Sequence, residues 1–267
     1  MSVITPHRLV PTGANVPDLS KGTSLLSTKD IPVDERLIVA LDVTSHRQAY
    51  DLVDQLGDAV KFYKVGLELF LAGNYQALIR DLVEDRGKKV FVDLKFFDVP
   101  ETVGAAVEQL QSCGATFATV HGNDQMLKYA VEARGTLKVL AVTVLTSLDQ
   151  ADLHDLGFRV SPEALTLSRT RRAIEIGCDG VVCSGQNASA LRTEYGHNFF
   201  IVSPGIRPVA NQIDRDDQKR TTTHIEAFEN GADYIVLGRP IRDEENPREF
   251  AEKLQAEIAD LFTAQAD

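Results

Sequence analysis

Residues 90–114 read VFVDLKFFDVPETVGAAVEQLQSCG and contain a complete strand–turn–helix unit. The apolar run Val90–Leu94 predicts a strand that is buried on both faces. Pro100 favours the first turn of a helix, and Gly114 is a typical stop, so we expect a helix over Pro100–Ser112. A unit of this kind builds a parallel sheet when it is repeated along a chain.

The same alternation of apolar runs and helix-length segments continues through the chain. Further helices are expected at Pro162–Ile176 and His224–Asn230, each followed by a glycine. The predicted strands are Leu37–Leu41, Val60–Val65, Val90–Leu94, Phe117–Val120, Val139–Leu145, Gly180–Cys183, Phe199–Val202 and Tyr234–Leu237. Eight such repeats predict an α/β protein with a closed (β/α)8 TIM barrel. An open doubly wound sheet is disfavoured, because Asp42–Ser45 follows the first strand without a glycine-rich phosphate loop.

One catalytic barrel domain is expected over residues 31–267, preceded by an extension of residues 1–30. The extension is a mixed polar run without the apolar core of a secretory signal, and we expect it to be flexible or loosely packed. The three cysteines, Cys113, Cys178 and Cys183, form no CxxC pair and are expected to be reduced thiols. These features predict a cytoplasmic protein.

Net charge and hydropathy limit the classes of binding partner that we expect. The net charge of −11 disfavours nucleic acid, whose phosphates an acidic protein repels at long range. A small anionic ligand remains compatible, because local cations and helix N-termini can bind it. No uncharged apolar run reaches the length of a membrane helix, so no membrane partner is expected.

Polar residues or glycines follow each of the eight predicted strands, where a barrel builds its active site. In chain order they are Asp42, Lys64, Asp93 with Lys95, His121-Gly122, Thr146-Ser147, Ser184-Gly185, Ser203–Arg207 and Gly238-Arg239. Loop polarity explains Ser184 well. It explains Lys64, Asp93 and Lys95 poorly, because these charges interrupt apolar runs.

Four charged residues are expected to form one cluster. Asp93 and Lys95 are two residues apart on a strand, so their side chains point to the same face. Asp98 lies just past the strand end, and Lys64 lies about 4.8 Å away on the neighbouring strand. An alternating Lys–Asp–Lys–Asp array follows. Ion pairs at a barrel mouth are costly to desolvate if they serve stability alone, which favours a catalytic role.

A second cluster is expected to bind phosphate. The loops after the seventh and eighth strands form the usual phosphate site of a barrel. Gly238 allows close approach of the backbone, and the forked donors of Arg239 suit phosphate oxygens. The segments Ser203–Arg207 and Asp216–Gln218 add a polar loop.

The motifs of the chain resemble those of the orotidine 5'-monophosphate decarboxylase family. The run Asp93–Thr102 (DLKFFDVPET) is similar to the family signature DxKxxDIPxT, with Val99 in place of isoleucine. Further matches occur in order at 40–42 (ALD), 64–66 (KVG), 144–147 (VLTS), 203–208 (SPGIRP), 217–220 (DQKR) and 237–241 (LGRPI).

The resemblance implies decarboxylation of orotidine 5'-monophosphate to uridine 5'-monophosphate (UMP) and CO2 in de novo pyrimidine biosynthesis, without cofactor or metal. It implies that Lys95 protonates the C6 carbanion and that Asp93 lies beside the substrate carboxylate. Lys64 orders the network and contacts the ribose, as does Asp42. The other substrate-binding residues that it implies are Thr102, Thr146, Ser147, Pro204, Arg207, Gln218, Gly238 and Arg239.

The family further implies a homodimer with shared active sites, in which Asp98 and Thr102 reach the site of the partner. Two alternatives stay open. One is a Mg²⁺-dependent keto-sugar-phosphate decarboxylase or aldolase on the same barrel frame, which is disfavoured because Lys64 precedes any acidic residue at the second strand end. The other is a non-catalytic ligand-binding barrel, disfavoured because Lys95 and both aspartates are present.

Overall fold

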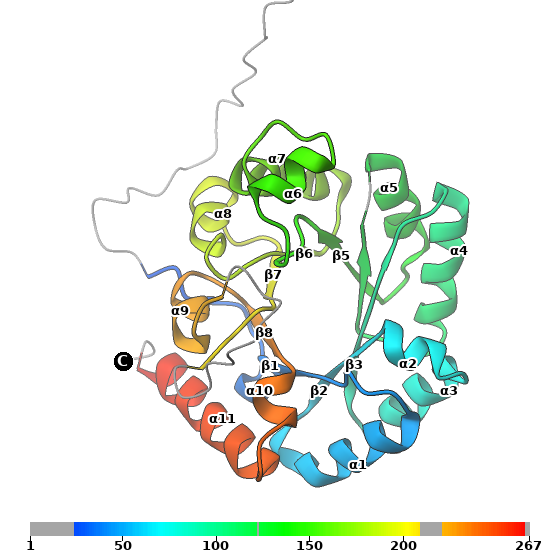
Figure 1. The fold of residues 1–267 in the computed structure, drawn as a ribbon, viewed down its shortest axis with the longest axis vertical. Coiled ribbons are helices and arrows are strands. Elements are labelled where there is room, and N and C mark those ends of the chain that lie inside the picture. Colours follow the sequence, from blue (N-terminus) through cyan, green and yellow to red (C-terminus); the bar gives the residue numbers. More distant parts are fainter. Residues whose placement is uncertain (1–23, 122, 209–220, 265–267) are drawn as a thin grey trace, which may run out of the picture.

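The computed structural model describes residues 24–121, 123–208 and 221–264. Eight parallel strands form a closed barrel in chain order, and the helices surround it (Figure 1). The strands are β1 (Leu37–Ala40), β2 (Phe62–Gly66), β3 (Lys89–Phe96), β4 (Phe117–Val120), β5 (Lys138–Val142), β6 (Gly180–Val182), β7 (Phe200–Ser203) and β8 (Tyr234–Leu237). The predicted (β/α)8 barrel is confirmed.

The helices connect successive strands along the outside of the barrel. They are α1 (His46–Leu56), α2 (Leu67–Leu71), α3 (Tyr75–Arg80), α4 (Pro100–Gln111), α5 (Asp124–Ala133), α6 (Gln150–Asp155), α7 (Pro162–Ile176), α8 (Ala188–Tyr195), α9 (His224–Glu229), α10 (Arg239–Arg242) and α11 (Pro247–Thr263). Short 3₁₀ or π segments lie at Val33–Glu35, Gly57–Ala59 and Asp81–Asp85. The three predicted helices agree with α4, α7 and α9 to within one residue at each end.

Strand alternation divides the apolar residues between two layers. Residues that point outward from the strands pack against the helices and form the larger core. Residues that point inward fill the lower half of the barrel with rings, and the Phe117 ring meets that of Tyr234 edge-on at 5.2 Å between centroids. Because this half is filled, the space left for a ligand lies at the carboxyl ends of the strands.

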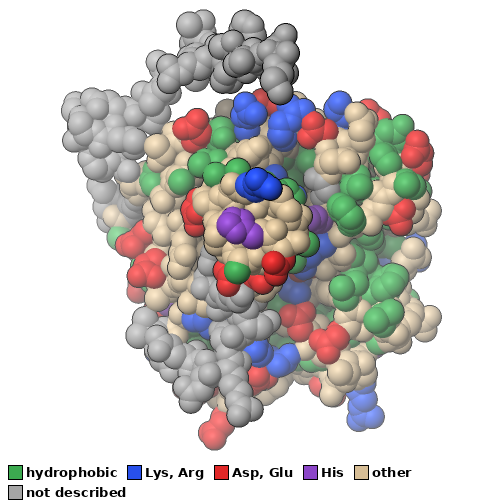
Figure 2. Space-filling model, turned by 45° about the horizontal axis from the view of Figure 1, so that its top comes forward, with side chains coloured by type: hydrophobic (Ala, Val, Ile, Leu, Met, Phe, Trp, Pro, Cys, Tyr) green, Lys and Arg blue, Asp and Glu red, His purple; other side chains and the backbone are tan. Residues whose placement is uncertain are grey.

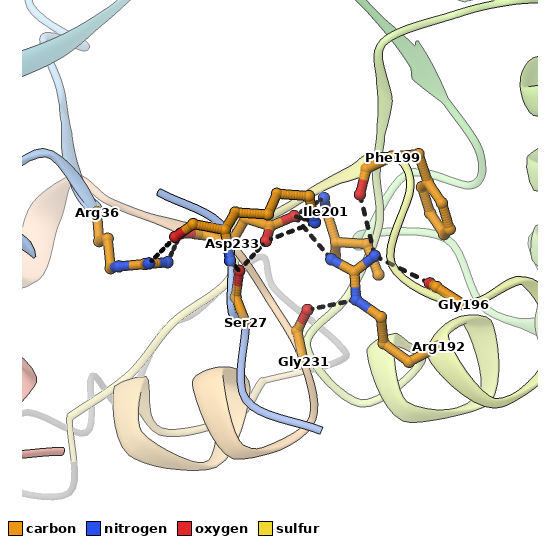
Figure 3. Close-up of polar contacts among 9 residues, drawn as sticks. Ser27, Arg36, Arg192, Gly196, Phe199, Ile201, Gly231 and Asp233 are labelled. Atoms are coloured by element: carbon orange, nitrogen blue, oxygen red, sulfur yellow. Dashed lines mark hydrogen bonds and ion pairs between the residues drawn. The ribbon is translucent and has the colours of Figure 1, made fainter. Parts of the chain in front are cut away.

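A buried ion cluster closes the opposite end of the barrel, just before β8 (Figure 3). The Asp233 carboxylate accepts hydrogen bonds from the Arg192 guanidinium at 2.7 Å and from the Ile201 backbone N–H at 2.8 Å. The Lys29 ammonium lies 3.0 Å from the same carboxylate, and the Ser27 hydroxyl also donates to it. These contacts join β7, β8 and α8 to the segment that precedes β1.

The predicted boundary at residue 30 lies too late in the chain. Residues 24–30 were expected to belong to a loosely packed extension, but Leu26 is only 2% exposed and Ser27 and Lys29 bind Asp233. A buried carboxylate needs partners, and this segment supplies two of them. The expectation for the earlier part of the extension falls on residues 1–23, outside the described residues.

Two strands differ from their predicted lengths by more than one residue. β3 runs on to Phe96, because a register irregularity between Val92 and Phe96 adds residues to it. β5 ends at Val142 rather than Leu145. The pairing with β6 ends at Val142 and Val182, and beyond it the backbone N–H and the hydroxyl of Thr143 both donate to the carbonyl of Val182.

Candidate active site

A cavity of about 530 Å³ opens at the carboxyl ends of the strands. The segments that line it belong to β1, β2, β3, β5, β6, β7 and β8 or follow them directly. Ten of the predicted site residues line it: Asp42, Lys64, Asp93, Lys95, Thr146, Ser147, Pro204, Arg207, Gly238 and Arg239. Residues predicted from separate parts of the sequence therefore meet in one place.

The floor of the cavity is apolar. It is made of apolar residues from five strands, of which Phe91 also packs against the buried ring of Phe117: Ala40, Phe91, Val142, Val182 and Val236. The polar residues follow two positions later on several of the same strands, which is the period of a β-strand. A flat, uncharged group can therefore rest on the floor while charged side chains surround its edge.

The charged wall is a continuous chain of four side chains. The Lys64 ammonium lies 2.8 Å from the Asp42 carboxylate and 3.6 Å from the Asp93 carboxylate. The Lys95 ammonium lies 2.9 Å from Asp93. The sequence predicted an alternating array, but with Asp98 as a member. Within a single polypeptide, the fourth member of this chain of charges is Asp42, which comes from the end of β1 beside Lys64.

Neighbouring groups stabilise the charged forms of Lys64 and Asp93 in this chain of charges. Burial disfavours the charge of Lys64, but the attraction of Asp93 and Asp42 and their hydrogen bonds outweigh it and raise the pKa of Lys64. Burial also disfavours the Asp93 carboxylate, but Lys64, Lys95 and a hydrogen bond from Thr119 lower the pKa of Asp93 below its usual range. Asp93 and Lys64 are both charged at neutral pH as a result.

Lys95 has an unusual backbone. Its φ is +50°, in the left-handed region that a non-glycine residue rarely occupies. The register of β3 against β4 shifts at this point, so β3 is not the regular strand that its apolar pattern predicts. Asp93 and Lys95 still face the same cavity, as predicted, and Leu94 between them packs against the outer core.

The predicted phosphate-binding segments lie across the barrel from β3. Pro204, Gly205 and Arg207 follow β7, and Gly238 and Arg239 follow β8. The Arg207 backbone N–H donates to the carbonyl of Thr222 at 2.9 Å, which ties this loop to the segment before α9. Gln218, also predicted to bind the ligand, lies outside the described residues.

Thr146 and Ser147 form the wall that follows β5. This wall begins at Thr143, whose carbonyl accepts a hydrogen bond from the Arg169 guanidinium of α7 at 3.0 Å. Thr143 is thereby held from β6 on one side and from α7 on the other. The segment that leads to Thr146 and Ser147 starts from a well-anchored point.

Two predicted residues do not reach this cavity. Asp98 and Thr102 are exposed and lie outside its lining. Asp98 accepts a hydrogen bond from the backbone N–H of Val99 at 2.7 Å, and Thr102 lies in the first turn of α4. Neither contributes to the cavity of its own chain.

The structure adds two residues to those predicted from the sequence. Thr119 of β4 bonds both to Asp93 and to the backbone of Lys95. Arg242 of α10 lines the cavity and donates to the backbone carbonyl of Asp42. Strand alternation places Thr119 inward with Phe117, so its position was accessible from the sequence. For Arg242 no comparable signal exists, since it lies one turn beyond a strand end.

Two absences hold for the described part of the chain. Among those residues no group of three or more His, Cys, Asp or Glu side chains is arranged to hold a metal ion. Within the same ranges no helix is long and apolar enough to cross a membrane.

Comparisons with known proteins agree with this geometry. Residues 35–254 match the family model described as orotidine 5'-phosphate decarboxylase / HUMPS family. The chain is 58% identical over 241 residues to an orotidine 5'-phosphate decarboxylase of Methylococcus capsulatus, covering 90% of this chain and 99% of the relative. It is 49% identical over 231 residues to one of Rhodopseudomonas palustris, covering 85% and 97%.

A solved structure shares the fold. The crystal structure of orotidine 5'-phosphate decarboxylase from Lactobacillus acidophilus superposes with a TM-score of 0.73 at 34% identity, covering 84% of this chain and 98% of that one. The cavity, its chain of charges and these similarities agree, and the protein belongs to the orotidine 5'-phosphate decarboxylase / HUMPS family.

Proposed function

We propose that this protein converts orotidine 5'-monophosphate to UMP and CO2, as the names of its relatives indicate. The observation that carries the proposal is the Lys95–Asp93 pair, which stands above an apolar floor in the same cavity as Arg239. A pyrimidine ring fits the floor, and a phosphate group fits the arginine side. Lys95 and Asp93 are then left for the atoms that react.

The reaction breaks the bond between C6 and the carboxylate carbon. CO2 leaves, the electron pair stays on C6, and Lys95 passes one proton from Nζ to C6, after which solvent reprotonates the amine. The carbanion has no conventional electron sink, so fixed charges must stabilise it. Lys95 supplies that charge, and Asp93 holds its ammonium at 2.9 Å.

The other residues would each bind a different part of the substrate. Asp42 and Lys64, which are already paired, would bind the ribose hydroxyls. Thr146 and Ser147 would bind the edge of the base. Pro204, Arg207, Gln218, Gly238 and Arg239 would hold the phosphate end. Phosphate binding far from C6 supplies energy that can be used to order the site around the reacting atoms.

We also propose a homodimer in which Asp98 and Thr102 complete the active site of the partner. Both residues are exposed and lie outside the cavity of their own chain. Exposed apolar side chains surround them on neighbouring units of the barrel: Leu67, Phe70, Leu71, Phe97, Val99 and Tyr129. Figure 2 shows apolar side chains gathered on the right of the view. A surface of this kind is typical of a subunit interface.

The cytoplasm is the proposed location. Cys113, Cys178 and Cys183 are buried free thiols, which suits a reducing compartment. The Mg²⁺-dependent alternative has no support from the Methylococcus and Rhodopseudomonas relatives, both of which are named decarboxylases of orotidine 5'-phosphate.

The test is decarboxylation of orotidine 5'-monophosphate by the purified protein, followed by its ultraviolet absorbance, with and without EDTA. We expect equal turnover in the two samples. Absence of turnover would contradict the proposed function. Activity that EDTA abolishes and Mg²⁺ restores would indicate the metal-dependent alternative.

A further inference from the structure

Thr119 of β4 lies directly behind the pair of residues proposed to do the chemistry. Its side chain is 0% exposed. The hydroxyl donates to Oδ1 of Asp93 at 3.0 Å and accepts from the backbone N–H of Lys95 at 2.9 Å. One buried hydroxyl therefore uses its donor and an acceptor site on two different members of the charged chain.

The irregularity of β3 explains why this hydroxyl is needed. Val92 pairs with Ala118 and Phe96 pairs with Val120, so three residues of β3 lie opposite the single residue Thr119. In a regular parallel ladder the N–H of Lys95 would donate to a carbonyl of β4. Here that partner is replaced by the Thr119 side chain.

The backbone at Lys95 also needs support. A residue with a Cβ is disfavoured at φ of +50°, and such a conformation persists only where its surroundings determine it. A buried N–H without a partner is disfavoured as well. The Thr119 hydroxyl accepts a hydrogen bond from the Lys95 N–H, so this N–H is not left without a partner in the conformation that directs the Lys95 side chain into the cavity.

We propose that Thr119 is a positioning residue that sets the Asp93 carboxylate and the Lys95 backbone in the arrangement the reaction requires. The proposal rests on the proposed function for its kinetic consequences. Its geometric part concerns the free protein alone.

The groups around Asp93 show what the hydroxyl adds. Lys64 approaches from β2 and Lys95 from the same strand, and both are cations. Asp42 of β1 reaches Lys64 from the other side, and Tyr75 of α3 donates its hydroxyl to the carbonyl of Val65. Thr119 is the neutral donor from β4, and its hydrogen bond holds Oδ1 of the carboxylate from a direction that neither ammonium group occupies.

The test compares variants that keep the hydroxyl of residue 119 with variants that lack it. Thr119→Ser keeps the hydroxyl, whereas Thr119→Ala and Thr119→Val remove it. Thr170→Val is the matched control, because Thr170 is equally buried and its hydroxyl has no hydrogen-bond partner among the described residues. Thermal unfolding of each variant shows which ones are folded at the assay temperature. If Thr119→Val is not folded there, Thr119→Ala serves as the hydroxyl-free variant.

We expect kcat of the hydroxyl-free variants to fall roughly 10- to 100-fold, the range for a small misplacement of reacting groups. UMP affinity should stay within about threefold, because the phosphate and base contacts are kept. The acid limb of the kcat/KM profile should move to higher pH, since Asp93 loses a donor that favours its charged form. Thr119→Ser and Thr170→Val should behave as wild type.

A second measurement does not depend on the substrate. The carboxyl carbon of Asp93, labelled with 13C and assigned by its loss in Asp93→Asn, reports the pKa of Asp93 by NMR. This pKa should rise in Thr119→Ala and stay unchanged in Thr119→Ser. Equal pKa values in the two variants, or equal loss of kcat in both, would overturn the role of Thr119. Inactivity of the wild type would instead overturn the proposed function, and the NMR result would still decide the geometry.

Discussion

The Lys95 ammonium lies 2.9 Å from the Asp93 carboxylate, although Lys95 has a backbone φ of +50° and stands in an irregular part of β3. A regular strand would place both side chains on one face but would not by itself bring their charged ends together. The left-handed backbone directs Lys95 toward the cavity and the carboxylate. Conformations of this kind are concentrated at functional sites, where the surrounding structure holds them.

Replacing Lys95 with alanine should abolish turnover and keep ligand binding. The proton donor and the nearest positive charge are both lost, so we expect kcat to fall by at least about 10³-fold. Binding of UMP, measured by calorimetry, should persist because Arg239 and the wall after β5 are untouched. Near-normal activity in this variant would rule out the role assigned to Lys95.

Arg239→Ala should weaken every complex that contains the phosphate. Loss of one charged donor set costs about 1.5–3 kcal/mol, which is roughly 10- to 100-fold in kcat/KM. UMP should therefore bind less tightly to the variant, while uridine, which lacks the phosphate, should bind both proteins equally. A variant with unchanged kcat/KM, or one that weakens uridine as much as UMP, would contradict the phosphate contact.

Mixed dimers test whether Asp98 serves the partner. Lys95→Ala and Asp98→Asn should each be nearly inactive alone. In an equal mixture, half of the dimers are hybrids with one intact site, so activity should recover to about one quarter of the wild type. Analytical ultracentrifugation gives the oligomeric state of each sample. A mixture no more active than the two proteins measured separately would show that Asp98 acts in the active site of its own subunit or has no role in catalysis.

The charged chain should make stability depend on pH at both ends of the scale. The folded pKa of Asp93 is lowered, so its contribution is present above the ordinary aspartate pKa and is lost as the pH falls through the folded value. The folded pKa of Lys64 is raised, so its contribution is present below the ordinary lysine pKa and is lost as the pH rises through the folded value.

Urea unfolding of wild type and Asp93→Asn from about pH 7 down to about pH 3 measures the acid part. The free energy of unfolding of the wild type should fall more steeply below about pH 5 than that of the variant. Parallel curves would show that Asp93 binds protons equally in the folded and unfolded states.

Asp233→Asn should affect stability and spare catalysis. Asp233 is fully buried with Arg192, Lys29 and Ser27 around it, so the variant leaves buried cations without their counter-ion (Figure 3). Breaking a buried pair costs about 3–5 kcal/mol of unfolding free energy. Asp51→Asn is the control, because Asp51 is 71% exposed and its pair with Arg47 should contribute less than about 1 kcal/mol.

The kinetic constants of Asp233→Asn should equal those of the wild type at temperatures where the variant is folded. Asp233 lies at the amino ends of the strands and outside the cavity lining. A large loss of kcat in the folded variant would indicate that the two ends of the barrel are coupled.

The sequence by itself determined the barrel and most of its site. Eight runs of buried-strand composition alternate with helix-length segments, and strand ends converge in a parallel barrel. The positions of Lys64, Asp93, Lys95 and Arg239 along the chain were therefore enough to predict that they share one cavity. Periodicity is a local property, and the chain shows it directly.

The tertiary structure decided what depends on register and on contacts between distant segments. The irregular pairing of β3 with β4 and the φ of Lys95 leave no periodic mark in the sequence. Strand alternation places Thr119 inward, but only the structure shows that its hydroxyl bonds to Asp93 and to the backbone of Lys95. The sequence also did not show that Asp42, rather than Asp98, completes the charged chain, or that the Ser27 hydroxyl donates to Asp233. Such contacts form only when separate strands are brought side by side, because each offers a partner for a group that would otherwise be buried alone.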